Sequence, residues 1–438
     1  MSSARVVITG VGSISSVGKT SSEMWESLCA GGCGIDKITA FDPVGFDCKI
    51  AGQVNDFKVR DYIPKSFRKS VKLMSRDIEL SIAAADEALR NSGIITKGMD
   101  PENVNVEAGR FAINLGAGLI SCDLVELEPS VSASVVDGKF DIQKWGSDGI
   151  EQITPLWLLK YLPNMLACHI GIIHDIQGPS NSLTCSEVAG LLAINEAAHI
   201  IARGDSDIAL AGGAEAKVNP MIMIRQCLLG RATSDNNDEP DKALRPFDAD
   251  AKGSVFGEGA GIVILESIEH AKGRDAKIYA ELAGIGESTN INPVYEHLEA
   301  DGKGVQIAIE KAMAEAQIGA EELDLIIPHG VGIAADDLAE SKGIEAALGE
   351  AVSKIPVWPT KSMVSNTGAA AGAIDVVAAV CAMREGKIPA AKNCENKIKG
   401  CNLNIVTEPV EAELNYVLCC GYGYGGQTAA IVLKKFDG

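Results

Sequence analysis

The sequence predicts an α/β protein with a large buried core. Apolar residues make up 46% of its 438 positions and aromatic residues only 5%, which is typical of closely packed helices and strands. Residues 4–10 contain a continuous β-branched run, and such strands are buried on both faces beneath helices. The length corresponds to two or three average domains, or to one large fold with two lobes.

The first half of the chain alternates strands and helices. A helix is expected over 75–92, because its apolar residues recur at helical spacing and Gly93 can end it. The helix expected over 187–203 is apolar nearly all round, which indicates a position in the centre of the molecule. The other expected elements are a helix over 20–30 and strands over 4–10, 110–117, 207–212 and 260–266.

The same α/β pattern restarts beyond a seam near residue 266. The expected elements are strands over 277–289 and 324–330, helices over 303–317, 336–348 and 373–384, and a closing hairpin over 415–435. Two successive patterns of this kind predict a division into two similar halves, 1–266 and 267–438. Within the first half, the stretch 120–165 is irregular and contains three prolines.

The charge and the cysteines argue against several classes of function. A formal net charge of −20 opposes binding to nucleic acid or to an anionic membrane surface. The twelve cysteines lack paired metal-ligand spacing, so neither a metal site nor a cofactor is expected. The N-terminal segment leads directly into a strand without a secretory leader, and no apolar run is long enough to span a membrane. These observations predict a cytoplasmic protein with reduced thiols.

Five sequence motifs occur in a fixed order along the chain. They are VVITGVGSISSVG, GPSNSLTC with GGAE, RPFDADAKGSVFGEGAGIVILE, KSM followed by GAAAGAID, and GYGYGG. Together they resemble the β-ketoacyl-acyl-carrier-protein synthase II-like family of the thiolase superfamily, over residues 4–436. The resemblance implies the thiolase fold, a five-layered α-β-α-β-α arrangement of two similar halves that works as a dimer. In that family, the stretch equivalent to 120–165 caps the site and forms part of the dimer surface.

A glutamate occupies the nucleophile position of that family. The family's reactive cysteine lies seven residues after the Ser of GPS and 28 residues before the Glu of GGAE. Counted from Ser180 and from Glu215, both spacings lead to Glu187. A carboxylate cannot form the acyl thioester through which condensation proceeds. Cys185 lies two residues earlier, and we interpret it as a buried apolar thiol rather than as a displaced nucleophile.

Only one of the family's two site histidines is present. His329, in the segment IIPHG, resembles the first histidine, whereas the position of the second holds Asn366. Asparagine can donate a hydrogen bond but cannot carry a proton. In the family, the two histidines assist decarboxylation of a malonyl thioester and stabilise the negative oxygen that forms. Because one of them is replaced, we interpret His329 first as a structural residue of the core.

Residues that hold the pantetheine arm in the family have also changed. Val331 and Ile333 replace two threonines whose hydroxyl groups contact the arm, so the arm would lose polar partners on entry. In the motif GYGYGG, Tyr422 and Tyr424 stand where the gate of the family carries phenylalanine, and a buried tyrosine hydroxyl needs a partner. We therefore assign these four residues to the substrate tunnel and its gate.

The charge of Glu187 depends on surroundings that the sequence leaves open. A helix N-terminus favours a carboxylate by roughly 0.3–1 kcal/mol, whereas burial without a partner raises its pKa. Lys361, Asp337 and Glu340 match residues that form a charged network beneath the site in the family. We expect these three residues to support the site structurally, and we expect a lysine beside Glu187 to neutralise its carboxylate.

A basic segment interrupts the acidic chain at residues 58–76. Such a run of charges is usually a solvated helix face. The family docks its acidic carrier protein near this region, so a docking surface is a second interpretation. The docking candidates are Lys65, Arg68, Lys69 and Lys72.

The combined losses of nucleophile, second histidine and arm-binding hydroxyls predict a subunit that keeps its scaffold without condensing. The chain most resembles the chain-length-factor type of homologue, which pairs with an active ketosynthase and shapes the acyl tunnel in fatty acid or polyketide biosynthesis. The expected partners are an active ketosynthase or a second copy, and acyl carrier protein. Three alternatives stay open: a malonyl-acyl-carrier-protein decarboxylase, an active condensing enzyme that uses Cys185, and a non-enzymatic homodimer that binds acyl chains.

Overall fold

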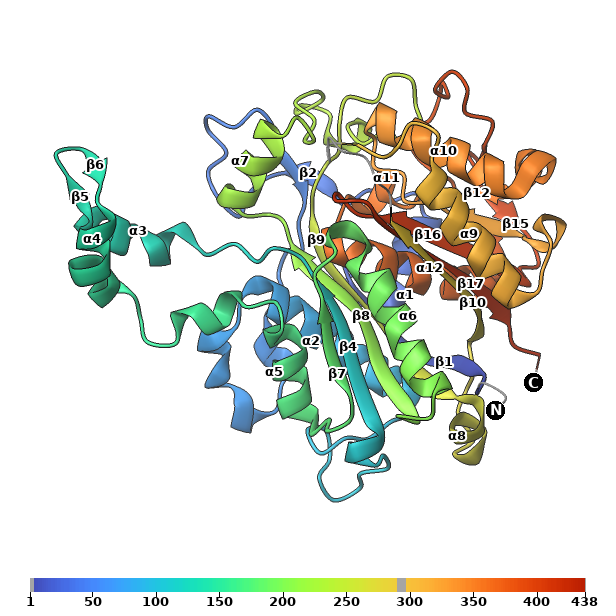
Figure 1. Ribbon diagram of the computed structural model, residues 1–438, viewed down its shortest axis with the longest axis horizontal. Coiled ribbons are helices and arrows are strands. Elements are labelled where there is room, and N and C mark those ends of the chain that lie inside the picture. Colours follow the sequence, from blue (N-terminus) through green and yellow to red (C-terminus); the bar gives the residue numbers. More distant parts are fainter. Residues whose placement is uncertain (1–3, 290–296, 438) are drawn as a thin grey trace.

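One mixed sheet organises the molecule (Figure 1). In the computed structural model, which describes residues 4–289 and 297–437, this sheet contains eleven strands among the described residues. In spatial order they are β14 (Asn404–Ile405), β12 (Pro356–Val357), β11 (Leu325–Ile327), β16 (Tyr416–Tyr422), β17 (Gln427–Lys435), β10 (Ala280–Thr289), β1 (Val6–Ile14), β9 (Glu258–Ser267), β8 (Ile208–Ala216), β4 (Phe111–Ala117) and β7 (Ser180–Leu183).

The sheet consists of two parts with the same internal order. The row β1-β9-β8-β4-β7 corresponds, strand for strand, to the row β10-β17-β16-β11-β12. The pairing directions agree as well, because β4 and β11 are each flanked by parallel neighbours and the remaining pairs are antiparallel. The two parts meet where β1 also pairs with β10, through Val7 and Ile8. The chain therefore has the two similar halves that its sequence predicts.

Helices form three layers around the two parts of the sheet. The outer helices are α2 (Arg76–Ser92) and α5 (Met165–His174) on the first part, and α9 (Lys303–Ala316) and α10 (Ala334–Leu348) on the second. The helices α6 (Ala189–Ala202) and α12 (Ala371–Glu385) contact strands of both parts, so they lie between them. This is the predicted five-layered α-β-α-β-α arrangement, and α6 is the central apolar helix.

The expected elements are present with shifted ends. The strand predicted over 4–10 continues to Ile14, and the helix predicted over 187–203 begins at Ala189, because residues 186–188 form a tighter 3₁₀ turn. The predicted boundary between residues 266 and 267 stays a prediction. The smaller elements are helices α1 (Ser21–Cys29), α7 (Pro220–Leu228), α8 (Ile268–Gly273) and α11 (Lys361–Val364), and two-stranded ladders of β2 (Ile35–Lys37) with β3 (Ile50–Gly52) and β13 (Lys387–Ile388) with β15 (Val410–Glu411). No helix in the part of the chain that the structure describes is long and apolar enough to cross a membrane.

Two glycines let backbones approach closely in the core. A Cβ atom on Gly12 of β1 would lie 2.1 Å from the carbonyl oxygen of Ala84 in α2. A Cβ atom on Gly213 of β8 would lie 2.3 Å from the carbonyl oxygen of Ala369. Both distances are far below any real carbon–oxygen contact, so only glycine fits at these positions. The second contact fixes the loop before α12 against the strand that leads into the candidate site.

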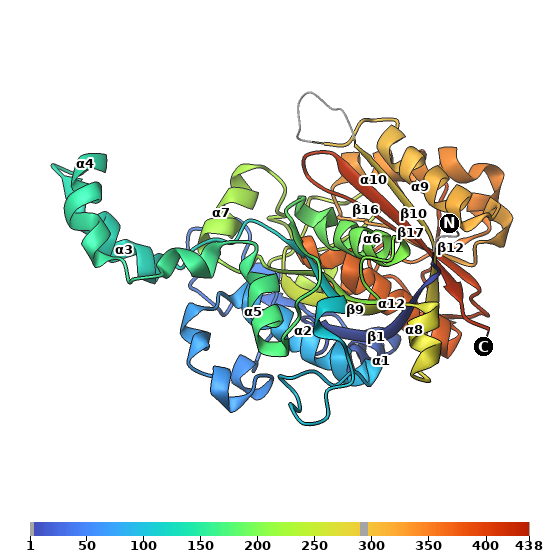
Figure 2. The same cartoon turned by 60° about the horizontal axis from the view of Figure 1, so that its bottom comes forward.

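The middle of the stretch 120–165 forms an arm that projects away from the candidate site of its own subunit, and the cap and dimer surface that the resemblance implies stay predictions. The arm carries α3 (Leu124–Ala133), the small ladder of β5 (Val135–Val136) and β6 (Lys139–Phe140), and α4 (Ile142–Lys144). Figures 1 and 2 show it extending away from the body of the molecule. Several of its apolar side chains are exposed, and Val125 is 85% exposed. Only the two ends of the stretch lie beside the candidate site.

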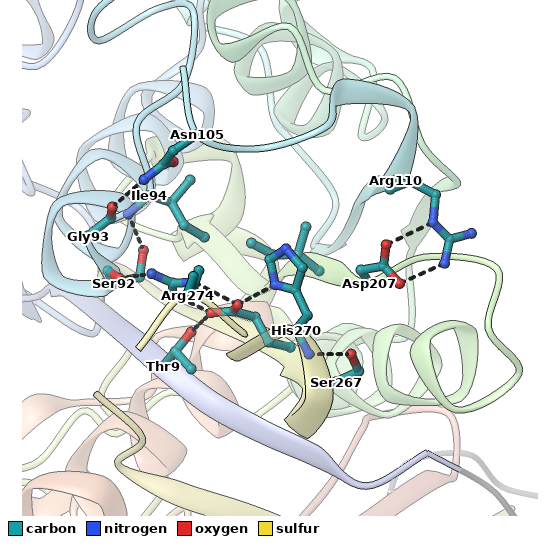
Figure 3. A network of polar contacts seen from close by, with 12 residues as sticks. Thr9, Ser92, Gly93, Ile94, Asn105, Arg110, Asp207, Ser267, His270 and Arg274 are labelled. Carbon is teal, nitrogen blue, oxygen red and sulfur yellow. Dashed lines mark hydrogen bonds and ion pairs between the residues drawn. The ribbon is translucent and has the colours of Figure 1, made fainter. Parts of the chain in front are cut away.

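A buried carboxylate ties several elements together at the end of β9 far from the candidate site. Figure 3 shows Thr9, His270 and Arg274 converging on one carboxylate, which belongs to the fully buried Glu266. The Thr9 hydroxyl donates to it, His270 Nδ1 lies 2.6 Å from it, and Arg274 Nε donates at 2.8 Å. Burial raises the pKa of Glu266, but the bonds from Arg274, His270 and Thr9 outweigh burial and lower it to about 2. The network therefore joins β1, β9 and α8 through an ionised group.

Candidate functional site

Segments that lie far apart in the sequence meet at the N-terminal end of α6. Glu187 lies on the 3₁₀ turn Ser186–Val188 that leads into this helix, and Tyr424 lies on the turn between β16 and β17. The backbone N–H of Tyr424 donates to Glu187 Oε2 at 3.1 Å. His329 follows β11, and its ring lies edge-on to Tyr422 with 4.5 Å between the ring centroids. The structure thus brings the predicted nucleophile position, first histidine and gate together.

Asn366 reaches this group of residues indirectly. Its backbone pairs with residues 255–257 just before β9, and its side-chain oxygen accepts from the N–H of Gly368 at 3.0 Å. The Gly368 backbone in turn lies directly against Glu215, where a Cβ would come within 1.9 Å of a carboxylate oxygen. The Asn366 side-chain nitrogen has no hydrogen-bond partner among the described residues.

Glu187 is a buried and ionised carboxylate. Its residue is 3% exposed, and the preceding Ser186 adopts a positive φ of 55°, a strained conformation that bends the chain into the turn. The Ser186 hydroxyl donates to Glu187 Oε2 at 2.5 Å. Burial raises the pKa of Glu187, but the positive charges of Lys217 and then Arg231 outweigh burial and lower the pKa to about 2. The carboxylate therefore stays charged at neutral pH.

A lysine and an arginine supply the positive charges beside Glu187. The lysine is Lys217, whereas Lys361 donates to Asp375 at 2.7 Å. Lys217 follows β8 and pairs with Glu215 at 2.8 Å. Arg231 follows α7, with its Nη2 atom 3.9 Å from Glu187 Oε1.

Sequence reasoning missed Lys217 and Arg231, although one signal was present. Side chains alternate across a strand, so a residue two positions after Glu215 points to the same face as Glu215. That rule places Lys217 beside the site. Arg231 follows the short helix α7 in a region without a regular pattern, so its position depends on the tertiary fold.

Asp337 and Glu340 brace the loop that carries His329. Their carboxylates accept hydrogen bonds from the four consecutive backbone N–H groups of residues 329–332, at 2.6–3.0 Å. Burial raises the pKa of Asp337 to about 7 and that of Glu340 to about 8. Lys361 forms an ion pair with Asp375, and its positive charge also opposes the rise in the pKa of Glu340, so the charged network of these residues stays a prediction. Their position supports the structural role that we expected.

His329 is a neutral and deeply buried side chain. Its residue is 1% exposed, and neither ring nitrogen has a hydrogen-bond partner among the described residues. Burial lowers its pKa well below the ordinary value, and the positive charge of Lys361 adds to this effect. The buried Tyr422 hydroxyl also lacks a partner in the described part of the chain. These polar atoms are what the inner site offers to a bound group.

Val331 and Ile333 are apolar core residues. Val331 is fully buried and Ile333 is 8% exposed, and both pack in the cluster that contains Phe247. Neither side chain offers a hydroxyl to a pantetheine arm. Their assignment to the tunnel stays a prediction.

A pocket of 510 Å³ adjoins the gate and was not predicted from the sequence. Ser186, Lys217 and Tyr424 form its inner wall, next to Glu187. The remaining lining residues are Ala117, Gly118, Leu119, Ile120, Tyr161, Pro163, Thr184, Glu215, Arg225, Gln226 and Leu229. This size and mixture of polar and apolar groups suit a small ligand or part of an acyl chain.

Cys185 has the surroundings of a structural thiol. It is half-buried and packs against the largest core cluster. Burial raises the pKa of its thiol, and the negative charge of Glu287 raises it further. A nucleophilic cysteine needs the opposite shift, toward the thiolate.

The four docking candidates lie on the surface. All four are exposed: Lys65 and Lys72 lie on the short 3₁₀ turns Lys65–Phe67 and Ser70–Leu73, and Arg68 and Lys69 connect these turns. None of them forms an ion pair with a residue in 4–289 or 297–437.

Taken with this geometry, the two-part sheet and the helix-end site define the thiolase-type fold of the ketosynthases. The family description of the β-ketoacyl synthase N-terminal domain matches residues 3–271, and that of the C-terminal domain matches residues 279–395. The chain belongs to the β-ketoacyl synthase family. The 3-oxoacyl-[acyl-carrier-protein] synthase 2 of Vibrio cholerae serotype O1 is 36% identical over 440 residues, which cover 99% of this chain and 100% of that protein.

Two solved structures have the same fold over nearly the whole chain. The ishigamide ketosynthase/chain length factor gives a TM-score of 0.84 at 28% identity. The complex AntDE:AntF, a type II polyketide synthase acyl-carrier protein with its ketosynthase bound to the hexaketide, gives 0.80 at 26% identity. Each comparison covers 99% of this chain and 100% of the other. The predicted thiolase fold and the predicted membership among the β-ketoacyl synthases of fatty acid or polyketide biosynthesis are confirmed.

Proposed function

We propose that this chain is a non-condensing subunit that pairs with an active ketosynthase, in the manner of a chain length factor. The observation that carries the proposal is the buried, ionised Glu187 at the nucleophile position. Acyl transfer in this family requires a thiolate, and a carboxylate cannot replace it in a thioester. The remaining scaffold keeps its fold and its pocket. The subunit therefore shapes the acyl tunnel of the pair rather than catalysing condensation.

The surroundings of Cys185 support the loss of condensation. Its raised thiol pKa and its packing against the core are those of a structural residue. The residue that follows it, Ser186, lines the pocket, whereas Cys185 does not. An active enzyme that uses Cys185 is therefore the weaker alternative.

The charge at Glu187 also opposes decarboxylation of a malonyl group. Removing carbon dioxide from a malonyl thioester builds negative charge on the thioester oxygen, which the site must stabilise. Glu187 adds a fixed negative charge nearby, and Asn366 replaces the second histidine. A malonyl-acyl-carrier-protein decarboxylase is therefore disfavoured by electrostatics as well as by residue identity.

Co-expression with a ketosynthase that has an intact cysteine and both histidines tests the pairing. Native mass spectrometry of the purified complex should show one copy of each chain, and the pair should extend an acyl chain that neither protein extends alone. If the chain remains a homodimer when it is co-expressed with that partner, the proposal is refuted. A homodimer that retains bound lipid would instead favour the acyl-binding alternative.

The basic turns at residues 65–72 are proposed as a docking surface for acyl carrier protein. They are exposed and carry four positive charges in a chain of net charge −20, so an acidic partner is attracted locally. The double variant Lys69→Glu/Lys72→Glu in the complex should weaken carrier binding several-fold at low salt. Lys354→Glu, an exposed lysine in the other half, serves as the control. Equal binding by both variants would refute the assignment.

A further inference from the structure

We propose that Glu187 and Arg231 latch the gate turn Gly423–Gly426 shut, so that this subunit excludes a carrier-borne pantetheine arm from its own site. The inference deepens the proposed function, on which it rests for the identity of the gate. A latched site explains how a subunit can keep an intact scaffold beside an active partner and still never receive a carrier-borne chain.

The gate turn is short and contains three glycines. It connects β16 to β17 and is closed by two backbone bonds, from the Gly423 N–H to the Gln427 oxygen at 2.8 Å and from the Gly426 N–H to the Gly423 oxygen at 3.0 Å. Gly425 and Gly426 adopt φ angles of 126° and 99°, which residues with side chains avoid. A turn of this kind has few internal restraints, so its position depends on what its central residue contacts.

The first contact of the latch is a hydrogen bond to a charged group. The Tyr424 N–H donates to Glu187 Oε2 at 3.1 Å, and Ser186 holds the same oxygen at 2.5 Å. Hydrogen bonds to an ionised acceptor are stronger than neutral ones. A cysteine at position 187 would end two atoms closer to the backbone and could not make this bond. The latch is therefore a property of the glutamate rather than of the turn.

The second contact holds the side chain of the same tyrosine. The Arg231 guanidinium lies over the Tyr424 ring, 4.9 Å from the centroid. Arg231 is itself fixed, because it lies 3.9 Å from Glu187 and 3.2 Å from Asp336 of α10. The gate residue is thus held by its backbone and by its ring, and both contacts lead back to the same buried ion pair.

Opening the gate breaks both contacts at once. Tyr424 and Ser186 also form part of the wall of the 510 Å³ pocket, so the closed turn separates that pocket from Glu187. A hydrogen bond to a charged group changes an equilibrium constant by at least about tenfold. We expect the latch to lower the open population of the gate by at least about tenfold.

Hydrogen–deuterium exchange of the isolated chain tests the latch. The variants are Glu187→Ala, which removes the acceptor, Glu187→Gln, which keeps an oxygen but loses the charge, and Arg231→Lys, which keeps the charge but loses the planar group over the ring. The matched control is Asp324→Asn. Its carboxylate accepts backbone N–H groups of Asn415 and Tyr416 at the other end of β16, at 2.6 and 2.9 Å.

The expected result is faster exchange in the peptide that contains residues 423–427. Glu187→Ala should raise its rate about tenfold, with smaller rises in Glu187→Gln and Arg231→Lys, whereas Asp324→Asn should change only the start of β16. If Glu187→Ala fails to fold, the other two variants decide. Exchange at the gate within twofold of the wild type in Glu187→Gln and Arg231→Lys overturns the latch. Because the isolated chain is measured, the result is independent of whether a ketosynthase pairs with it.

Discussion

Position 187, the predicted nucleophile position, holds a buried carboxylate beside two positive charges. The residue lies at the entry to the central helix, where unpaired N–H groups and the helix dipole favour an anion. Lys217 and Arg231 add full positive charges, so a side chain that would be penalised by burial is instead held ionised. The same surroundings would act on any acidic group placed there.

A cysteine restored at this position should be an unusually reactive thiol. In Glu187→Cys, the charges of Lys217 and Arg231 would lower the thiol pKa below its usual value of about 8.5. Iodoacetamide labelling followed by mass spectrometry should then modify the new cysteine rapidly near pH 6.5, and adding Lys217→Met should move the rate profile to higher pH. We expect no condensation, because Asn366, Val331 and Ile333 are unchanged. Labelling that rises only above pH 8.5 would contradict the electrostatic account.

The buried carboxylate of Glu266 should make the protein sensitive to acid. Its pKa is about 2 in the folded chain and 4.5 ordinarily, so its stabilisation is complete above pH 4.5 and is lost as the pH falls toward 2. That shift corresponds to about 3 kcal/mol. Glu266→Gln should therefore lower the thermal unfolding temperature at pH 7, and the gap to the wild type should narrow below pH 4. A gap that is constant with pH would show that ionisation of Glu266 is not the cause.

At the scale of elements, the contact between α2 and β1 shows how small residues set the spacing of the layers. The helix backbone lies directly on the strand at Gly12, so the layers are closer here than ordinary side chains permit. In contrast, Gly171 in the middle of α5 has no atom within 3.7 Å of the place where a Cβ would lie. An added methyl group would therefore clash with α2 at Gly12 but would have room at Gly171.

Substituting alanine at each of these glycines gives opposite results. Gly12→Ala should destabilise the fold by about 1–3 kcal/mol, because the methyl group has no room beneath α2. Gly171→Ala should stabilise it by about 0.5–1 kcal/mol, because alanine loses less conformational freedom in a helix. Thermal unfolding of the two variants beside the wild type measures both effects. Destabilisation by Gly171→Ala would show that α5 has a constraint beyond its backbone.

At the scale of the whole molecule, the projecting arm is the feature that the single subunit does not explain. Its exposed apolar residues include Val125, Phe140 and Ile142, at 85%, 51% and 65% exposure. Several exposed apolar side chains on one projecting segment are typical of an interface with another chain. We therefore expect the arm to be covered by a partner subunit.

Polar substitutions on the arm should weaken assembly without changing the stability of the subunit. Phe140→Ser with Ile142→Ser should raise the dissociation constant of the assembly at least tenfold, because each side chain loses a buried apolar contact. Sedimentation velocity over a concentration series measures this. Val44→Ser, at a residue that is 81% exposed outside the arm, is the control. Unchanged assembly of the arm variant would show that the arm is not an interface.

The sequence alone determined the order of the elements and the two similar halves, and it predicted that Glu187 occupies the nucleophile position. These are properties of local spacing: β-branched runs, helical periodicity and fixed distances from GPS and GGAE define them without reference to distant segments. For the same reason, the ends of the elements moved by only a few residues.

The tertiary structure decided the charge of Glu187, the identity of its counter-charges and the course of the arm. Arg231 lies 44 positions from Glu187 in the sequence, and Tyr424 lies 237 positions away, yet both contact its carboxylate. The sequence left open which lysine lies beside Glu187; it is Lys217, whereas Lys361 pairs with Asp375. Electrostatic and packing energies depend on distances in space, and such distances between remote segments exist only after the layers have assembled.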